Sequence, residues 1–298
     1  MKPLRRVLLP RSSEAHLFCY SFPSLCQISQ IETAVKSLNF SMAADDILHG
    51  FSNLPLVWNM ARQDVRLRYV RSVIGPLWVT ITMALYVMGI GFVFGGLFGA
   101  PVREVVPWIA IGMIIWSLLS NILNEASVVL VQHRALLLQA KLSVSMFVLF
   151  VLLRNAIISA HHMVIYLLLF VVGLVAPSWN IVWIIIGLPL LFVAAFGFGL
   201  WAAILSARFH DLPPFFSSLT MVGFLFVPVM WRPVDLQRYR EIADWNPLTH
   251  VLAALRDPML GLPPSTLSLA VLGLTALICF GFGVLTLVYA RRRVVFWI

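Results

Sequence analysis

The sequence predicts an all-α polytopic membrane protein with six transmembrane helices. Of its 298 residues, 61% are hydrophobic and 11% are charged, which is more apolar surface than a soluble core of this size would bury. Six apolar runs follow one another along the chain, and about 20 apolar residues are needed to cross the hydrocarbon of a bilayer. We therefore expect lipid to be the solvent for much of the chain.

Charge and cysteine content exclude several other classes. The net charge of +9 belongs to short basic blocks beside the apolar runs. We interpret these blocks as topology signals and expect no nucleic-acid partner. Cys19 and Cys26 lie near the N-terminus and Cys279 lies in an apolar run, so neither a disulfide framework nor a metal site is indicated.

Residues 1–44 are predicted to be a leader or disordered extension, and residues 45–298 a single transmembrane domain. The short apolar pieces of the leader are broken by Pro10 and Pro23, and it lacks the continuous apolar core of a secretory signal. Met42 is an alternative start, and a cytosolic interfacial arm is the other interpretation.

Residues 45–72 show a helical pattern that is broken at Pro55. At about 100° per residue, one face carries Trp58, Ala61, Val65 and Tyr69. Such an amphipathic helix can lie in the headgroup plane, where arginines contact lipid phosphates. The arginines concerned are Arg62, Arg66, Arg68 and Arg71. The alternative is a positive-inside flank without a mechanical role.

We expect the membrane crossings at residues 77–98, 105–131, 150–175, 181–205, 215–231 and 267–290. Basic blocks at 62–71, 134–141, Arg208 and 291–293 then fall on one side of the membrane. On the other side, the long segment 232–264 has four arginines balanced by four acids. The positive-inside rule places both termini in the cytosol.

Segment 232–264 is expected to form two short helices, separated at Asn246-Pro247. Two short, half-apolar helices between the fifth and sixth crossings favour a re-entrant pair over a soluble domain. That arrangement suits a gate at the outer end of a transport path.

The sequence lacks the common motifs for nucleotide binding, metal binding and nucleophilic catalysis. A P-loop needs Gly-Lys followed by Ser or Thr, but Lys2, Lys36 and Lys141 follow Met, Val and Ala. HExxH, CxxC and GxSxG are also absent from the sequence. We expect no catalytic residue and no metal site in this chain.

Ionisable groups inside a membrane domain indicate function, and the predicted crossings contain Arg154, His161 and His162. No acid lies at a predicted mid-membrane depth, which weakens a proton relay. The histidines are either hydrogen-bonded between helices or face a substrate.

Two cytosolic loops are candidates for docking a separate ATPase. The first, residues 131–143, carries Arg134 and Lys141. The second, residues 206–215, carries Arg208, His210 and Asp211 before a double proline, which stiffens the start of the next helix.

Five segments resemble, in order, the membrane subunit of ABC-2 type polysaccharide exporters. The resemblance is strongest to O-antigen permeases and weaker to capsular polysaccharide and teichoic-acid permeases. The five segments read RQDVRLRYVRSVIGPLW, NEASVVLVQHRALLLQAKLS, RNAIISAHHMVIYLLLF, ARFHDL and WNPLTHVLAALRDPMLG. The resemblance covers about residues 45–298.

This resemblance implies a homodimer in the bacterial inner membrane, with two copies of a nucleotide-binding subunit that carries the ATP and Mg²⁺. This chain itself would bind no cofactor, and the cargo would be a lipid-linked glycan. The basic stretch 62–71 would line the cytosolic entrance.

The resemblance also assigns two sets of residues. The periplasmic gate would comprise Trp231, Tyr239, Trp245, Asn246, Pro247 and His250. Aromatic faces available to a glycan path are Tyr86, Phe92, Phe94, Trp116, Phe224 and Phe226. The alternatives are an ABC-2 exporter of a small lipophilic molecule and an ion-coupled secondary transporter.

Overall fold

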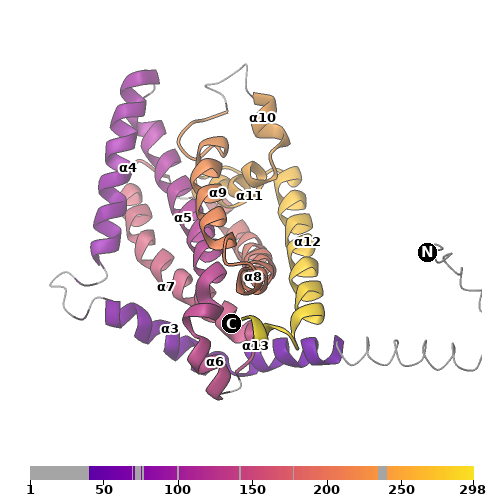
Figure 1. The fold of residues 1–298 in the computed structure, drawn as a ribbon. Helices are drawn as coiled ribbons and strands as arrows, with labels where there is room; N and C mark the ends of the chain where they lie inside the picture. The colour runs from indigo at the N-terminus through magenta and orange to yellow at the C-terminus, as the bar shows by residue number, and fades with distance from the viewer. Residues whose placement is uncertain are drawn as a thin grey trace, which may run out of the picture.

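The computed structural model describes residues 40–68, 70, 75, 77–98, 101–140, 142–176, 178–233 and 240–298. Within these ranges all regular secondary structure is helical, and no strand occurs. The all-α fold expected from the sequence is therefore confirmed for the described chain (Figure 1). The predicted leader lies outside these ranges except for residues 40–44, which already belong to a helix spanning 40–52.

Twelve labelled elements follow helix 40–52 in the described chain. They are α3 (Leu54–Arg68), α4 (Leu77–Phe98), α5 (Val102–Gln132), α6 (Arg134–Ala140), α7 (Val144–Val171), η1 (Trp179–Trp183), α8 (Ile184–Arg208), α9 (Leu212–Phe226), α10 (Arg240–Trp245), α11 (Pro247–Met259), α12 (Thr266–Ala290) and α13 (Val294–Trp297).

Among the described residues, four segments are long and apolar enough to cross a membrane: α5, α7, η1 with α8, and α12. Residues Leu77–Val93 of α4 and the whole of α9 are apolar but shorter. The chain is thus a polytopic membrane protein, while six crossings stay a prediction. The existence of two short helices between α9 and α12 agrees with expectation, but their re-entry into the membrane is not tested.

Some helix boundaries differ from the predicted crossings. Helix α9 ends at Phe226, five residues before the predicted end at 231. Val227 is extended, with φ −92° and ψ 135°, because a residue that precedes proline is disfavoured in the helical region, and Pro228 follows it. Helix α7 starts at Val144, six residues earlier than predicted, and is continuous to Val171.

The helices connect two ends of the bundle (Figure 1). We call basal the end with helix 40–52, α3, α6, α13 and the C-terminus, and apical the end with α10 and α11. The basic blocks of α3, α6 and residues 291–293 share the basal end, as the loop charges predict.

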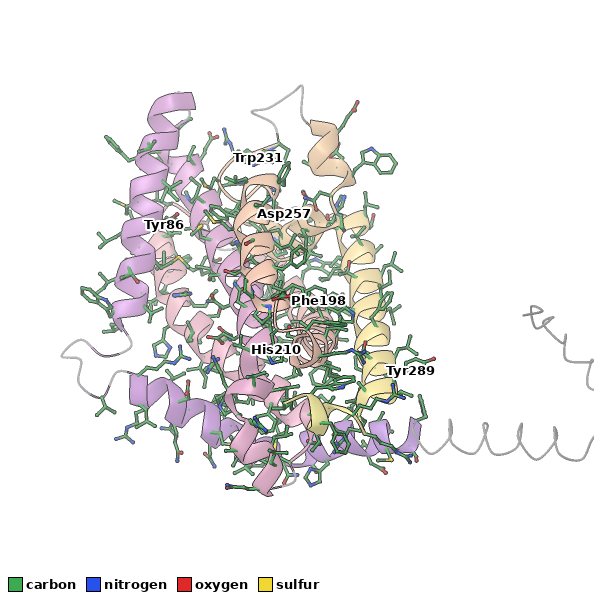
Figure 2. The ribbon with its side chains drawn as sticks, in the orientation of Figure 1. Tyr86, Phe198, His210, Trp231, Asp257 and Tyr289 are labelled. Carbon is green, nitrogen blue, oxygen red and sulfur yellow. The ribbon has the colours of Figure 1, made fainter. Side chains whose placement is uncertain are left out.

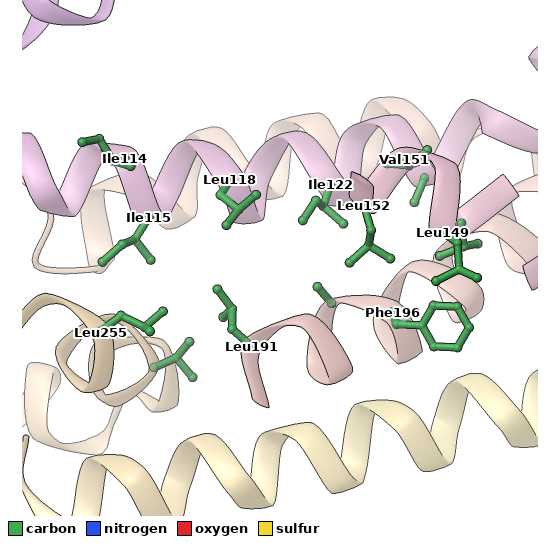
Figure 3. Close-up of a cluster of buried hydrophobic side chains, with 14 of the residues drawn as sticks. Ile114, Ile115, Leu118, Ile122, Leu149, Val151, Leu152, Leu191, Phe196 and Leu255 are labelled. Carbon is green, nitrogen blue, oxygen red and sulfur yellow. The ribbon is translucent and has the colours of Figure 1, made fainter. Parts of the chain in front are cut away.

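Helix α5 forms the centre of the bundle and contacts α4, α7, α8, α9 and α11. Figure 3 shows Leu118 and Ile122 of α5 facing Leu191 of α8, all three buried. In contrast, the outer faces of α4 and α12 carry exposed apolar side chains, including Met88, Leu277 and Phe282, and Tyr289 projects from α12 (Figure 2). Such outer faces suit contact with lipid.

Helices α8 and α12 approach closely enough for their backbones to touch. A Cβ atom on Gly197 would overlap the backbone of Cys279 and Phe280, and one on Gly283 would overlap the backbone of Gly197. Small residues permit this close packing between apolar helices, where dispersion contacts and not the hydrophobic effect drive association.

Replacing Gly197 by Ala should destabilise the bundle by about 1–3 kcal/mol, since overpacking forces the helices apart. Thermal unfolding of the purified chain in detergent would measure this loss. Gly281→Ala is the matched control, because a Cβ at Gly281 on α12 meets no atom within 4 Å. Equal unfolding temperatures for the two variants would contradict the close packing of α8 and α12.

Candidate functional site

An open groove of about 590 Å³ lies between α4, α5 and α9, with one wall residue from α7. Its lining mixes hydroxyl, amide, aromatic and apolar side chains: Val79, Thr82, Met83, Tyr86, Met113, Trp116, Ser117, Ser120, Asn121, Asn124, His162, Ser217, Thr220, Met221 and Phe224. We refer to this set as the α4–α5–α9 groove.

A polar stripe on α5 forms the floor of the groove. Ser117, Ser120, Asn121 and Asn124 are spaced three or four residues apart, which places them on one helical face. Asn124 Nδ2 donates to Thr220 Oγ1 at 3.2 Å. This hydrogen bond ties α5 to α9, a helix in which only Phe216 is buried.

Three of the six aromatic residues predicted for a glycan path meet in this groove. Trp116 and Phe224 lie with ring centroids 6.1 Å apart, and Tyr86 lines the groove from α4. Phe92, which is 78% exposed, and Phe226 do not line it. The side chain of Phe94 lies outside the described part.

The adjacent histidines on α7 have different surroundings. His161 Nδ1 donates to Ile157 O of its own helix at 2.7 Å, and His161 O accepts from Thr80 Oγ1 of α4 at 3.0 Å. His162 is 3% exposed, and neither of its ring nitrogens has a hydrogen-bond partner among the described residues. His162 is among the residues that line the groove, while its ring nitrogens are covered by neighbouring atoms, and a substrate-facing role stays a prediction.

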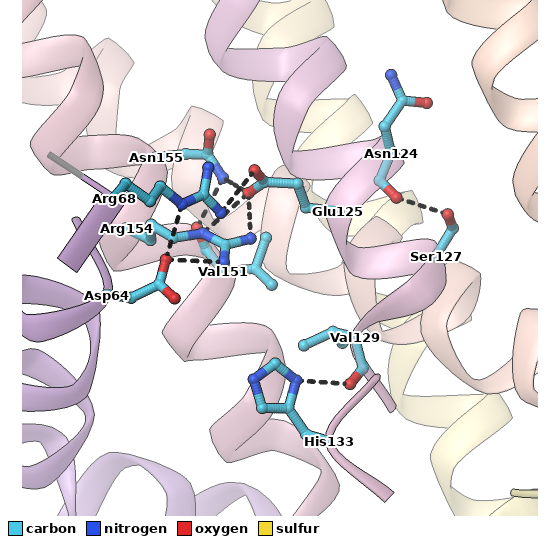
Figure 4. A network of polar contacts seen from close by, with 10 residues as sticks. All are labelled: Asp64, Arg68, Asn124, Glu125, Ser127, Val129, His133, Val151, Arg154 and Asn155. Atoms are coloured by element: carbon cyan, nitrogen blue, oxygen red, sulfur yellow. Dashed lines mark hydrogen bonds and ion pairs between the residues drawn. The ribbon is translucent and has the colours of Figure 1, made fainter. Parts of the chain in front are cut away.

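Arg154 lies at the centre of a network of ion pairs (Figure 4). Its side chain is 7% exposed, and Nη2 lies 2.6 Å from Glu125 Oε2 on α5. Nη1 lies 3.2 Å from Asp64 Oδ2 on α3. Asn155 also donates to Glu125. A buried charge requires such partners, and they join three helices that are far apart in sequence.

The same network changes the interpretation of the basic stretch. Arg68 Nε lies 3.1 Å from Asp64 Oδ2, and Arg68 Nη2 lies 3.9 Å from Glu125 Oε1. Arg62 and Arg66 are exposed and have no ion pair within the described ranges. Arg71 falls outside those ranges. On α3, Arg62 and Arg66 are therefore the two arginines that are exposed and have no ion pair in the described chain.

The amphipathic pattern itself is confirmed for α3. Its buried residues are Val57, Ala61 and Val65, whereas Trp58, predicted on that face, is 45% exposed. The buried face packs on α7. α3 is thus attached to the bundle by an apolar stripe and by the ion pairs of Asp64.

Asp46 is a basal residue that the sequence did not single out. Its side chain is fully buried, accepts from Val144 N at 3.2 Å and Ser145 N at 3.0 Å, and pairs with Arg291. The carboxylate caps the N-terminus of α7, where the helix dipole favours negative charge. Helix 40–52 is therefore bound to α7 and to the residues after α12.

Both predicted docking loops lie at the basal end. Arg134 opens α6 and is exposed, whereas Lys141 is outside the described residues. Arg208 ends α8 and stacks over the ring of Trp297 at 5.1 Å. His210 (Figure 2) and Asp211 are exposed in the turn before α9. These exposed groups are free to contact another subunit.

The apical residues predicted as a gate mostly serve local structure. Asn246 Oδ1 accepts from Leu248 N at 3.0 Å and caps α11, and Pro247 occupies its first turn, where proline is favoured. His250 bonds Ser268 Oγ at 3.2 Å and Asp244 O at 3.0 Å. Trp245 is 87% exposed, and Tyr239 lies outside the described residues.

Arg256 of α11 organises this end, although the sequence did not point to it. It is 2% exposed, its Nη1 donates to Pro228 O at 2.7 Å, and its guanidinium lies 3.3 Å from the centroid of the Trp108 ring. Trp108 Nε1 donates to Trp231 O at 3.1 Å. Burial lowers the pKa of Arg256 to about 10, so it remains charged at neutral pH and clamps the turn after α9.

Replacing Arg154 by Met should destabilise the chain by about 3–5 kcal/mol, because the carboxylates of Glu125 and Asp64 lose their shared cation. Hydrogen exchange followed by mass spectrometry should also show faster exchange in α3. Arg62→Met, an exposed change on α3 itself, is the matched control. Unchanged exchange in α3 of the Arg154 variant would contradict a role for the network in holding this helix.

Comparison with known proteins gives the family. The ABC-2 type transporter model matches residues 55–260. A relative, the O-antigen export system permease protein RfbA of Klebsiella pneumoniae, is 23% identical over 208 residues, which cover 66% of this chain and 77% of the relative. The family match extends from α3 through α11, which includes the groove, the ion-pair network and the apical clamp. The chain therefore belongs to the ABC-2 type transporter family.

Proposed function

We propose that this ABC-2 permease carries a lipid-linked polysaccharide of the O-antigen kind across the bacterial inner membrane. Membrane subunits of this family are transport components that depend on an ATPase partner. The observation that carries the proposal is the α4–α5–α9 groove, where a polar stripe and three aromatic faces line an open path between apolar helices. The similarity to an O-antigen export permease supports the same cargo class.

A homodimer would complete this path. The groove is open along one side of the chain, and α4 and α9 beside it expose apolar residues such as Leu85 and Met221. A second copy packed against α4 and α9 would enclose the groove and turn two half-paths into a channel. Hydroxyls and amides then contact the sugar, while apolar faces contact lipid or the other copy.

The basal end is the proposed cytosolic side, with both termini facing the cytosol. On α3, Arg62 and Arg66 are exposed and are the proposed contacts for the diphosphate of the lipid carrier, since guanidinium binds phosphate oxygens through paired hydrogen bonds. Arg68 supports α3 through its ion pairs instead. At the apical end, α10 and α11 would form the periplasmic gate.

Two copies of a separate nucleotide-binding subunit, which hold ATP and Mg²⁺, would dock on α6 and on the turn that contains His210 and Asp211. That turn leads directly into α9, which lines the groove. A conformational change of the nucleotide-binding subunits would therefore be transmitted to the α4–α5–α9 groove through α9.

A second candidate function is export of a small lipophilic molecule. A cavity of about 260 Å³ between α5, α7, α8 and α11 is lined by apolar side chains such as Leu118, Met163 and Phe192. This cavity has the chemistry for such a cargo but is separated from the polar stripe. Ion-coupled transport has less support, because Glu125 and Arg154 neutralise one another.

Asp211→Lys should abolish export while leaving membrane insertion intact, because the side chain is exposed and makes no cap hydrogen bond. The measurement is surface glycan in the native cell together with co-purification of the ATPase. We expect at least a tenfold loss of both, since reversing one close charge pair changes affinity by about that factor.

Glu241→Lys makes the same charge change on exposed α10 at the opposite end and should keep the ATPase bound. Wild-type glycan export by the Asp211 variant would overturn the proposed docking turn. Transport of glycan by the purified chain alone in liposomes would overturn the proposed dependence on an ATPase.

A further inference from the structure

We propose that the α4–α5–α9 groove selects an uncharged, hydroxyl-rich chain and disfavours anionic polymers. This inference rests on the proposed function and narrows it, because exported glycans include both neutral and acidic kinds. It is argued from the hydrogen-bonding state of the groove and from the charges that line it.

None of the described residues that line the groove carries a formal charge. The fifteen of them contain no Asp, Glu, Lys or Arg. Arg154, whose partner Glu125 directly follows the groove residue Asn124, is engaged with Glu125 and Asp64. An anionic group inside the membrane domain needs a counter-charge, and the groove offers none.

The hydroxyl groups of the groove present oxygen lone pairs. Ser117 Oγ donates to Ile114 O at 2.9 Å and Ser120 Oγ to Ser117 O at 3.3 Å. Thr82 Oγ1 donates to Trp78 O at 3.1 Å, and Thr220 Oγ1 donates to Ser217 O at 2.9 Å. The hydrogens of these four hydroxyls are thus used within their own helices, and what these groups offer to the groove is an acceptor.

Two further groups are left without partners. Asn124 donates its amide to Thr220, which leaves its buried Oδ1 with no hydrogen bond within the described residues. Both ring nitrogens of buried His162 are also unsatisfied. Buried polar atoms without partners are rare in proteins, and these atoms belong to residues that line the groove but are themselves covered by neighbouring atoms.

The two cargo classes differ in what they offer to such a surface. Sugar hydroxyls can donate hydrogen bonds to the serine and threonine oxygens and accept from the amide of Asn121. Carboxylates and phosphodiesters only accept, so the oxygen lone pairs repel them, and the amide of Asn121 offers them a hydrogen bond but no counter-charge. The rings of Tyr86 and Trp116 provide apolar faces for the carbon-bound hydrogens of either sugar and do not discriminate charge.

Binding of two oligosaccharides to the full chain in lipid nanodiscs tests this inference. One probe is maltoheptaose, which has seven uncharged glucose units, and the other is heptagalacturonate, which has a carboxylate on every unit. Saturation-transfer NMR titration gives the two dissociation constants. We expect the neutral sugar to bind at least tenfold more tightly.

A charged residue introduced into the groove should change the ratio of the dissociation constants of the two oligosaccharides. Asn121→Lys should strengthen heptagalacturonate binding about tenfold through one added ion pair, and Asn121→Asp should weaken it further. Gln132→Lys is the control, because it adds the same charge at the exposed end of α5 outside the groove. Its dissociation constants should equal those of the wild type.

Equal or tighter binding of the acidic sugar by the wild type would overturn the selectivity and leave glycan export standing. Binding of neither sugar would overturn both the selectivity and the glycan path through this groove. An equal effect of Gln132→Lys and Asn121→Lys would also overturn the inference, because the acidic sugar would then respond to net charge and not to the groove.

Discussion

The buried guanidinium of Arg154 sets the arrangement of the basal half of this permease. A charge taken out of water is stable only with close partners, and Glu125 of α5 and Asp64 of α3 are those partners. The basic helix α3 is therefore held to α5 and α7. Glu125 directly follows Asn124, which bonds α5 to α9, so one turn of α5 connects the basal helix with the wall of the proposed path. A shift of α3 would be transmitted to the groove at this turn.

Hydropathy and the positions of helix-breaking residues predicted most of the helices. Each predicted span is an apolar run, and the thickness of the bilayer sets the length that such a run needs. Helix α4 has the predicted bounds, and the Asn246-Pro247 signal marks the start of α11. The end of α9 was missed, although the restriction that Pro228 places on Val227 was readable. Six crossings, the dimer and the orientation in the membrane stay predictions. The close contact of Gly197 with α12 depends on a pairing of helices that no local pattern contains.

The site was predicted in part. Tyr86, Trp116 and Phe224 were chosen as aromatic residues on predicted crossings, and the fold brings them together. The polar stripe of α5 was missed, although its three- and four-residue spacing was a usable signal. Asp46 and Arg256 could not be assigned from sequence, because their partners lie far along the chain, at Ser145 and Pro228. Arg68 was assigned to lipid, and its side chain, which is 44% exposed, also pairs with Asp64 and Glu125 of the bundle.

The central claim is that cargo glycan passes along the α4–α5–α9 groove, and site-specific photocrosslinking in the native cell tests it most directly. A benzophenone side chain would replace Tyr86, which lines the groove, or Met88, which is exposed on α4 outside it. The account predicts glycan-bearing adducts at position 86 and lipid adducts alone at position 88. Glycan adducts at position 88 with none at position 86, or at neither position in actively exporting cells, would contradict it.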